Sequence, residues 1–241
     1  MKTLPKINAV YWLCLIGASI FGTNTGDYLA EVLGLGHMVG FPWLVVAFGL
    51  VFLVDRLYAK GTPLFFWAAI IVIRTAATNV GDAFGDFHIG FTVSLPIVFG
   101  LYVIAAGVYT LSARPSELAA TTVKVSPLYW LCMILAGILG TVGGDYASFG
   151  LHLMPIGTTI VFGGLALLMI AFGHKLWTSP LFYWACLAIV RTAGTGAGDA
   201  LAHLLGLPQA TLLTGSVFIV LIATFYFFIQ NNRSTAVSSQ T

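Results

Sequence analysis

A short motif that contains a carboxylate recurs four times in this chain, each time within or at the end of a long apolar segment. The motif is small-Thr-x-x-Gly-Asp, and its four acids are Asp27, Asp82, Asp145 and Asp199. Each acid follows a tryptophan by fifteen residues, and these are Trp12, Trp67, Trp130 and Trp184. A carboxylate inside a membrane helix is costly and usually marks a functional site. Four at equivalent places predict one shared polar site, built by internal repeats.

Composition places the chain among membrane proteins. Only 7% of its 241 residues are charged, whereas 59% are hydrophobic. A soluble domain has about 25% charged residues, so there is almost no room for one here. The net charge of +2 is too small to indicate a nucleic-acid partner, and the lipid bilayer is the expected partner. The first apolar stretch has no suitable cleavage site, and we interpret it as part of the first repeat rather than as a signal peptide. Nothing indicates the oligomeric state.

The repeats are related in pairs. Repeats one and three share Tyr-Trp-Leu-Cys and Gly-Asp-Tyr, whereas repeats two and four share Pro-Leu-Phe, Arg-Thr-Ala and Gly-Asp-Ala. This pattern indicates that a two-helix unit was duplicated and that the resulting pair was duplicated again. We therefore divide the chain into a first half, 1–116, a second half, 117–230, and a polar tail, 231–241.

Each repeat is expected to form two transmembrane helices, which predicts an all-α polytopic membrane protein with eight helices. The expected helices cover residues 8–33, 42–58, 63–86, 96–112, 127–150, 155–173, 180–204 and 208–229. Their lengths suit a hydrocarbon core of about 30 Å. Three of the first helices of a repeat start with a capping residue and proline, as in Ser126-Pro127, and all the second helices start at a proline.

The distribution of basic residues predicts the orientation. Eight of the ten Lys and Arg residues lie on the side of the N-terminus: Lys2, Lys6, Arg56, Lys60, Arg114, Lys124, Lys175 and Arg233. The opposite loops contain none. Because cytoplasmic loops are enriched in Lys and Arg, both termini are expected in the cytoplasm. The four repeats then enter the membrane in the same direction, as parallel repeats.

The four aspartates are the centre of the candidate site. Fifteen helical residues span about 22 Å, so with the tryptophans as an aromatic belt at the cytoplasmic interface the acids lie in the outer half of the bilayer. The threonine of each motif shares the face of its aspartate, one turn below: Thr23, Thr78, Thr141 and Thr195. We interpret these eight residues as an ion-binding site. The alternative is tight helix packing through the small residues of the motif, with Thr and Asp bonded across helices.

Two arginines and a group of acids and histidines accompany this site. Arg74 and Arg191 lie eight residues before their aspartates, inside the hydrocarbon region. They are either an internal ion pair that locks the two halves together or a counter-charge for a substrate. Residues that could ligate a metal at the outer mouth are Glu31, Asp86, His203, His37, His88 and His152. Carboxylate and imidazole ligands would suit manganese or a similar divalent ion, which is the one possible cofactor.

The fourfold two-helix repeat, the tryptophan of each repeat and the Gly-Asp motif together resemble a family of bacterial integral membrane proteins. That family has four tandem repeats of unknown function, each with two transmembrane segments, and is described as "uncharacterized membrane-anchored protein". The resemblance covers residues 8–230. It implies a multi-pass protein of the bacterial inner membrane, and it implies no activity.

Three functions remain open at this point. The first hypothesis is a transporter or channel for a small cation, either a divalent metal or a proton, that uses the aspartate ring. The second is a redox or sensor protein that binds a quinone, haem or pigment among the aromatic residues. The third is a structural membrane subunit that transports nothing. An enzyme is not expected, because there is no nucleophile–base arrangement, phosphate loop or HExxH motif.

Overall fold

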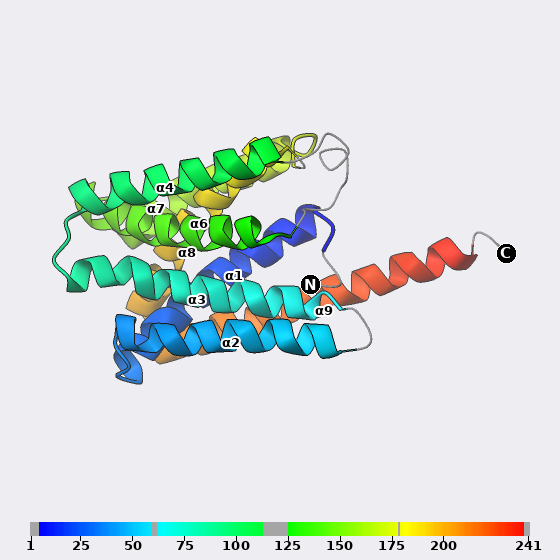
Figure 1. Cartoon of the computed structure of the whole chain (residues 1–241), viewed down its shortest axis with the longest axis horizontal. Helices are drawn as coiled ribbons and strands as arrows, with labels where there is room; N and C mark the ends of the chain where they lie inside the picture. The colour runs from blue at the N-terminus through cyan, green and yellow to red at the C-terminus, as the bar shows by residue number, and fades with distance from the viewer. Residues whose placement is uncertain (1–4, 59–61, 113–124, 178, 239–241) are drawn as a thin grey trace.

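The chain folds into a bundle of helices that lie side by side along the long axis of the molecule (Figure 1). The computed structural model describes residues 5–58, 62–112, 125–177 and 179–238, with side chains described as far as Phe227. The helices in these ranges are α1 (Ala9–Asp27), α2 (His37–Leu57), α3 (Leu64–Asp86), α4 (Phe91–Ser112), α6 (Pro127–Asp145), α7 (Met154–Phe172), α8 (Pro180–Leu205) and α9 (Leu207–Ser238). Two π-helical turns, η1 (Tyr28–Val32) and η2 (Tyr146–Gly150), continue α1 and α6.

The helix boundaries follow the expected chemistry at some ends and depart from it at others. The Ser126 side chain accepts a hydrogen bond from the backbone N–H of Tyr129, which caps α6 as expected. The helices α2 and α4 begin five residues before Pro42 and Pro96. Both prolines therefore lie inside their helices, where each removes one i→i−4 hydrogen bond, and the expected helix starts were more than one turn too late. The last helix, α9, runs to Ser238, into the region that was expected to be a polar tail.

The helices form two concentric layers. In the inner layer α1, α3, α6 and α8 contact one another in that order, and α8 closes the ring against α1. In the outer layer α2 packs mainly on α3, α4 on α6, α7 on α8 and α9 on α1. Each outer helix thus packs mainly on the inner helix of the next repeat along the ring, and less on the inner helix of its own repeat. This interlocking ties the end of the chain to its beginning.

Glycine allows the inner helices to approach closely. The glycine that precedes each aspartate faces the motif threonine of the next inner helix, so that an added Cβ would lie only 2.7–3.0 Å from that threonine's Cβ. The pairs are Gly26–Thr78, Gly81–Thr141, Gly144–Thr195 and Gly198–Thr23. Because the same two positions meet at every interface, the inner helices run parallel and in register. The small residues of the motif therefore do form packing edges, as the sequence indicates.

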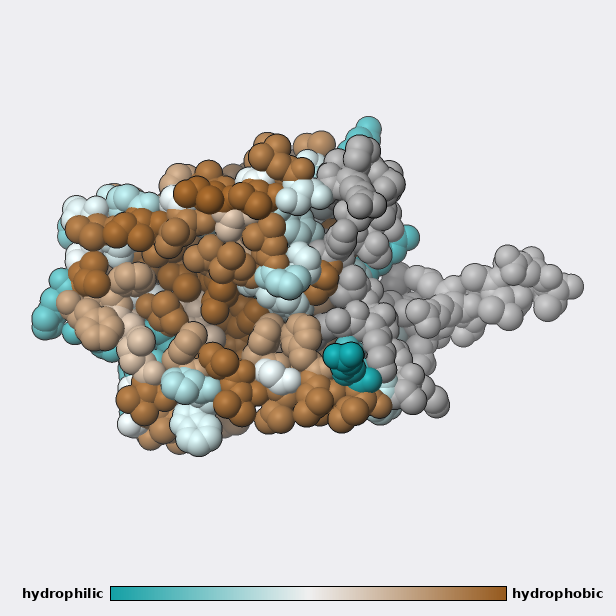
Figure 2. All heavy atoms as spheres, in the orientation of Figure 1, coloured by the Kyte–Doolittle hydropathy of each residue, from teal (hydrophilic) through white to brown (hydrophobic). Residues whose placement is uncertain are grey.

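The outer layer is largely apolar on its exposed side, and Figure 2 shows hydrophobic side chains over the middle of one face. Within the described ranges, six helices are long and apolar enough to cross a membrane: α2, α3, α4, α6 together with η2, α7, and α9 as far as Phe227. This confirms an all-helical protein of membrane character. Membrane crossing by the more polar helices α1 and α8, and hence the full set of eight transmembrane helices, stays a prediction.

The tryptophans do not form the predicted aromatic belt. Trp12, Trp67, Trp130 and Trp184 are all buried, with at most 8% of the side chain exposed. Outer helices cover them, as where Phe48 of α2 packs edge-on against Trp130 with ring centroids 5.3 Å apart. The prediction assumed that the tryptophan near the start of each inner helix faces lipid. It was wrong because an outer helix from another repeat covers this tryptophan.

Candidate cation site

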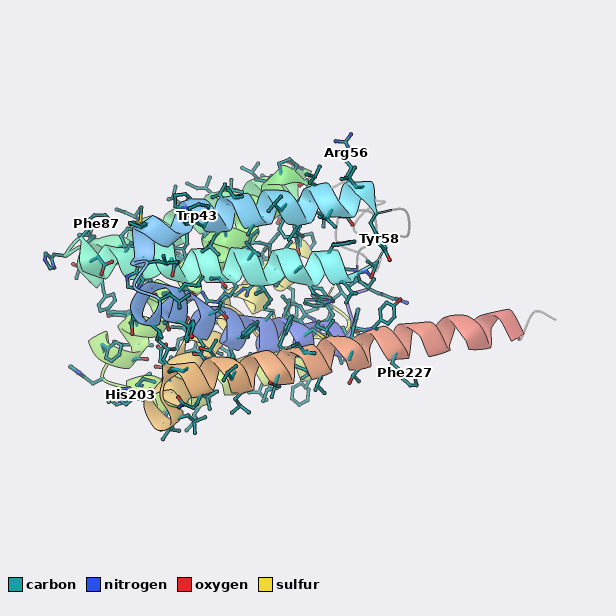
Figure 3. The ribbon with its side chains drawn as sticks, turned by 90° about the horizontal axis from the view of Figure 1, so that it is seen from below. Trp43, Arg56, Tyr58, Phe87, His203 and Phe227 are labelled. Atoms are coloured by element: carbon teal, nitrogen blue, oxygen red, sulfur yellow. The ribbon has the colours of Figure 1, made fainter. Side chains whose placement is uncertain are left out.

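The two ends of the bundle differ in charge. We call the end where the inner helices finish the acidic end, because it carries Glu31 and Asp86, both exposed. The opposite, basic end carries Lys6, Arg56 and Lys175, also exposed. Figure 3 shows Arg56 and His203 at opposite ends of the molecule. The four motif aspartates lie toward the acidic end, in the last turns of the inner helices or just before η1 and η2.

One arginine closes the centre of the inner ring beneath these aspartates. All four motif threonines bond the Arg74 guanidinium: Nη1 donates to Thr78 and Thr141 at 2.8 and 2.9 Å, and Nη2 donates to Thr23 and Thr195 at 2.6 and 2.7 Å. Arg74 is fully buried. Since one planar group reaches a hydroxyl from every inner helix, it occupies the axis of the ring. We call this set of five residues the Thr–Arg74 layer.

The second arginine has a different environment, although it occupies the equivalent position of the fourth repeat. Arg191 is fully buried, and none of its three guanidinium nitrogens has a hydrogen-bond partner in the part of the chain that the structure describes. Its strongest electrostatic neighbours are tyrosines toward the basic end, Tyr183 and Tyr129 first, whereas those of Arg74 include Asp82 and Asp27. The predicted ion pair between the halves is therefore not observed: within the described ranges neither arginine has a carboxylate within salt-bridge distance.

The aspartates themselves are partly open to the acidic end. All four are half-buried, and 22% of the Asp82 side chain is exposed. A cavity of about 440 Å³ lies between α3, α4 and α6, and its lining includes Asp82, Asp145 and His88. The ring is thus closed beneath by the Thr–Arg74 layer and open to the exterior of the bundle at the acidic end.

A histidine connects two of the carboxylates at this end. His37, at the start of α2, has Nδ1 2.8 Å from an Asp86 carboxylate oxygen and Nε2 4.0 Å from an Asp82 oxygen. Asp86 is about half exposed, so the three side chains form a line from the surface of the bundle to the ring. The imidazole of a histidine can accept a proton on one nitrogen and donate one from the other. Nε2 is too far from Asp82 for a direct hydrogen bond, so a proton would pass along this line to Asp82 through a bridging water.

The other residues predicted at the mouth are more scattered. Glu31 is exposed in η1 and acts electrostatically on Asp27 and Asp199. His203 is exposed in the last turn of α8, and His152 lies in the loop after η2 outside the lining of the cavity. Among the residues that the structure describes, no group of three or more His, Cys, Asp or Glu side chains could hold a metal ion. Of the six candidates, the described contacts bring together His37 and Asp86, which are too few ligands for a metal centre.

The sequence analysis did not identify two asparagines near the site. Asn24 and Asn79 follow the motif threonine directly in repeats one and two, and both are fully buried. The Asn79 amide has no hydrogen-bond partner within the described ranges, and an added Cβ on Gly26 would lie 3.3 Å from its oxygen. A polar amide inside an apolar segment, next to the motif, was the signal that could have revealed them.

A ring of aromatic side chains toward the basic end was also missed. It consists of the residues that precede the repeat tryptophans: Tyr11, Phe66, Tyr129 and Tyr183. The ring centroids of Tyr11 and Phe66 are 6.3 Å apart. The Tyr183 hydroxyl lies 2.7 Å from that of Tyr11 and 3.2 Å from that of Tyr129. They precede the tryptophans that were predicted to form an aromatic belt, and the structure places them in the core as well.

The π-helical turns distinguish the repeats. They follow Asp27 and Asp145 immediately, whereas α3 and α8 continue as α-helices past Asp82 and Asp199. A π-turn shifts the side chains that follow it and is frequent at functional sites. It explains why the residues one turn beyond the aspartates, such as Glu31 and His203, do not occupy equivalent positions.

Comparison with known proteins agrees with the repeat. Residues 10–60 and 128–179 match the model of a family described as Repeat of Unknown Function (DUF347). These segments contain repeats one and three, so the predicted resemblance to a repeat family of unknown function is confirmed, and the chain carries this repeat in both halves. No curated protein and no solved structure matches the chain.

Proposed function

We propose that this protein is a multi-pass membrane protein that binds a small cation at its aspartate ring and takes part in moving it across the membrane. The observation that carries the proposal is the position of the ring. Four half-buried carboxylates surround the axis at one depth, open to the acidic end and closed beneath by the Thr–Arg74 layer. Carboxylates that are purely structural are expected to be paired, because an unpaired buried charge is costly.

The geometry favours a proton over a divalent metal. A divalent ion needs several ligands in one coordination sphere, and the described residues offer no such group. A proton needs only one carboxylate at a time, and intramembrane chains of Asp, Glu and His are typical of proton relays. The line from Asp86 through His37 to Asp82 is a short chain of this kind. A divalent metal is therefore the second candidate for the bound cation.

The proposed orientation places the acidic end outside the cell and the basic end in the cytoplasm of a bacterium, within the inner membrane. Its support is the asymmetry of Lys and Arg between the two ends. In this arrangement the structure corresponds to a state in which the ring is accessible from outside. The Thr–Arg74 layer is then the barrier on the way to the cytoplasm, and a positively charged guanidinium on the axis repels cations.

A flux assay in liposomes tests the proposal. The purified chain is reconstituted, and the decay of an imposed pH gradient is followed with a trapped pH-sensitive dye, with sodium, potassium or manganese gradients as separate arms. Single Asp-to-Asn changes at Asp27, Asp82, Asp145 and Asp199 keep the side-chain shape and remove the charge, and we expect each to reduce the maximal rate at least tenfold. Lys175→Gln is the control, since it removes an exposed charge at the opposite end of the bundle and is expected to leave the maximal rate unchanged.

Two outcomes would decide against a transporter. If the unchanged protein moved no cation in any arm, it would be a structural subunit or a sensor. If flux were present and all four Asn variants kept it, the aspartates would be packing residues. An absorption spectrum of the same purified sample tests the remaining alternative, because a bound haem, quinone or pigment would be visible in it.

A further inference from the structure

The inner ring holds hydrogen-bond donors without acceptors on the basic side of the Thr–Arg74 layer. A guanidinium carries five N–H donors and no acceptor. The nitrogens of Arg191 have no partner within the described ranges, and the side chain is fully buried. Its equivalent Arg74 has four threonine hydroxyls as acceptors. The contrast shows that the protein supplies acceptors for both terminal nitrogens of one buried guanidinium and for none of the nitrogens of the other.

The tyrosine hydroxyls near Arg191 add one more unused donor, although their oxygens can also accept. Tyr11, Tyr129 and Tyr183 are joined by two hydrogen bonds, of 2.7 and 3.2 Å. Three hydroxyls supply three protons, and two bonds use two of them, so one O–H remains to donate elsewhere. All three tyrosines are among the strongest electrostatic neighbours of Arg191. Within the described ranges no hydrogen bond joins a tyrosine oxygen to Arg191, so the unused donors of this group remain available to a negatively charged or strongly accepting partner.

Charge balance leads to the same requirement. Arg191 lacks a carboxylate within salt-bridge distance in the described ranges, and Arg74 is close enough to repel it. Arginine stays protonated in proteins, so it cannot relieve the cost of burial by losing its proton. A buried charge without a partner is strongly unfavourable. A bound anion would balance the charge and accept the unused protons at once.

We propose that Arg191 and the hydroxyl cluster of Tyr11, Tyr129 and Tyr183 bind a small monovalent anion, chloride or a planar oxyanion such as nitrate, within the inner ring. This site is separate from the aspartate ring: the Thr–Arg74 layer lies between them. The anion is the counter-ion of Arg191 and accepts hydrogen bonds from its guanidinium and from the free tyrosine hydroxyl. Cations would then bind on the acidic side of the Thr–Arg74 layer, and the anion would bind on its basic side.

Thermal unfolding of the purified full-length protein in detergent tests this site. Sodium chloride or sodium nitrate replaces sodium gluconate at constant ionic strength, so that only the small anion changes. We expect the midpoint of unfolding to rise with chloride or nitrate and to saturate, as binding to the native state requires. The rise should be absent in Arg191→Ser, which carries the residue that repeat one has at the equivalent Ser19.

Two further variants make the result decisive. Tyr183→Phe removes one hydroxyl and keeps the ring, and Phe66 shows that phenylalanine fits this position of the aromatic ring. We expect it to change the apparent affinity for chloride, because it frees the hydroxyls of Tyr11 and Tyr129 from their bonds to Tyr183. This readout remains if Arg191→Ser fails to fold. Lys175→Gln, which removes an exposed positive charge, should behave as the unchanged protein.

Equal stability in gluconate, chloride and nitrate would overturn the proposal, because ordered water would then suffice for Arg191. If Tyr183→Phe left the rise of the unfolding midpoint with chloride unchanged, the proposal would also be overturned, since the anion would then bind elsewhere. No ion gradient is applied and no aspartate is changed, so failure here leaves the cation proposal standing. Loss of the cation proposal would likewise leave this result intact.

Discussion

The two buried arginines occupy equivalent positions in the sequence, yet the structure predicts opposite consequences when each is replaced by serine. Arg74→Ser removes the centre of the Thr–Arg74 layer, with its four hydrogen bonds of 2.6–2.9 Å. Arg191→Ser removes a side chain whose guanidinium bonds to no described residue. Serine is a fair replacement in both, because Ser19 occupies the same position in repeat one.

The size of the difference can be worked out from the contacts. Hydrogen bonds to a charged group contribute about 1.5–3 kcal/mol each, so four would give about 6–12 kcal/mol. Part of this is recovered, because the hydroxyls of Thr23 and Thr195 already donate to backbone carbonyls one turn earlier, at 3.0 and 3.3 Å, and keep these bonds. We therefore expect Arg74→Ser to cost about 3–5 kcal/mol more than Arg191→Ser, the usual range for breaking a buried charged network. The loss of the aliphatic stem is common to both variants and cancels.

Thermal unfolding in detergent and gluconate measures this difference without a contribution from small anions. For a chain of this size, 1 kcal/mol shifts the midpoint by about 2–4 °C, so Arg74→Ser should unfold roughly 6–20 °C below Arg191→Ser. Arg74→Lys is the control for charge alone, and it should fall in between, because an ammonium group has only three donors for the four hydroxyls. Equal destabilisation by the two serine variants would mean that the four hydrogen bonds from Arg74 to the threonines contribute nothing to stability.

Further outcomes follow from packing and exposure. Gly140→Ala should destabilise by about 1–3 kcal/mol, because its Cβ would overlap that of Arg191, whereas Gly143→Ala, with no contact under 3.7 Å, should be neutral or slightly stabilising in the same unfolding assay. A lipid-attached quencher should reduce the fluorescence of Trp43, which is 69% exposed. Trp43→Phe should abolish most of that quenching, and unchanged quenching would show that other tryptophans face lipid. A cysteine in place of Lys175 should react with an impermeant thiol reagent only from the cytoplasm, and labelling from outside would reverse the orientation.

The helical class and the inner layer could be predicted from the sequence. Long apolar segments with few charges permit only membrane helices, and the glycine and threonine of each motif recur at a spacing that places them on one helix edge. The contact of Gly81 with Thr141, repeated at the other three interfaces, is what such an edge predicts. These features follow from periodicity along one helix, which a sequence displays directly.

The contacts between different units could not be predicted in the same way. Nothing in the sequence shows that α2 packs on α3 and α9 on α1, and this exchange brings α2 against Trp130 and α9 against Trp67, both buried. The different roles of Arg74 and Arg191 were hidden for a similar reason. A guanidinium is long enough to point toward either end of the bundle, and which way it points depends on neighbours from all four inner helices.

The central claim is that the aspartate ring opens to the acidic end and is closed beneath by the Thr–Arg74 layer. Thiol accessibility tests it most directly, in a background where Cys14, Cys132 and Cys186 are alanine, the residue of repeat two at Ala69. Asp145→Cys should react from outside with a small impermeant cationic thiol reagent. Met133→Cys, fully buried on the other side of the layer, should not react. Reaction of Asp145→Cys from the cytoplasmic side alone, or of both cysteines from outside, would contradict this account.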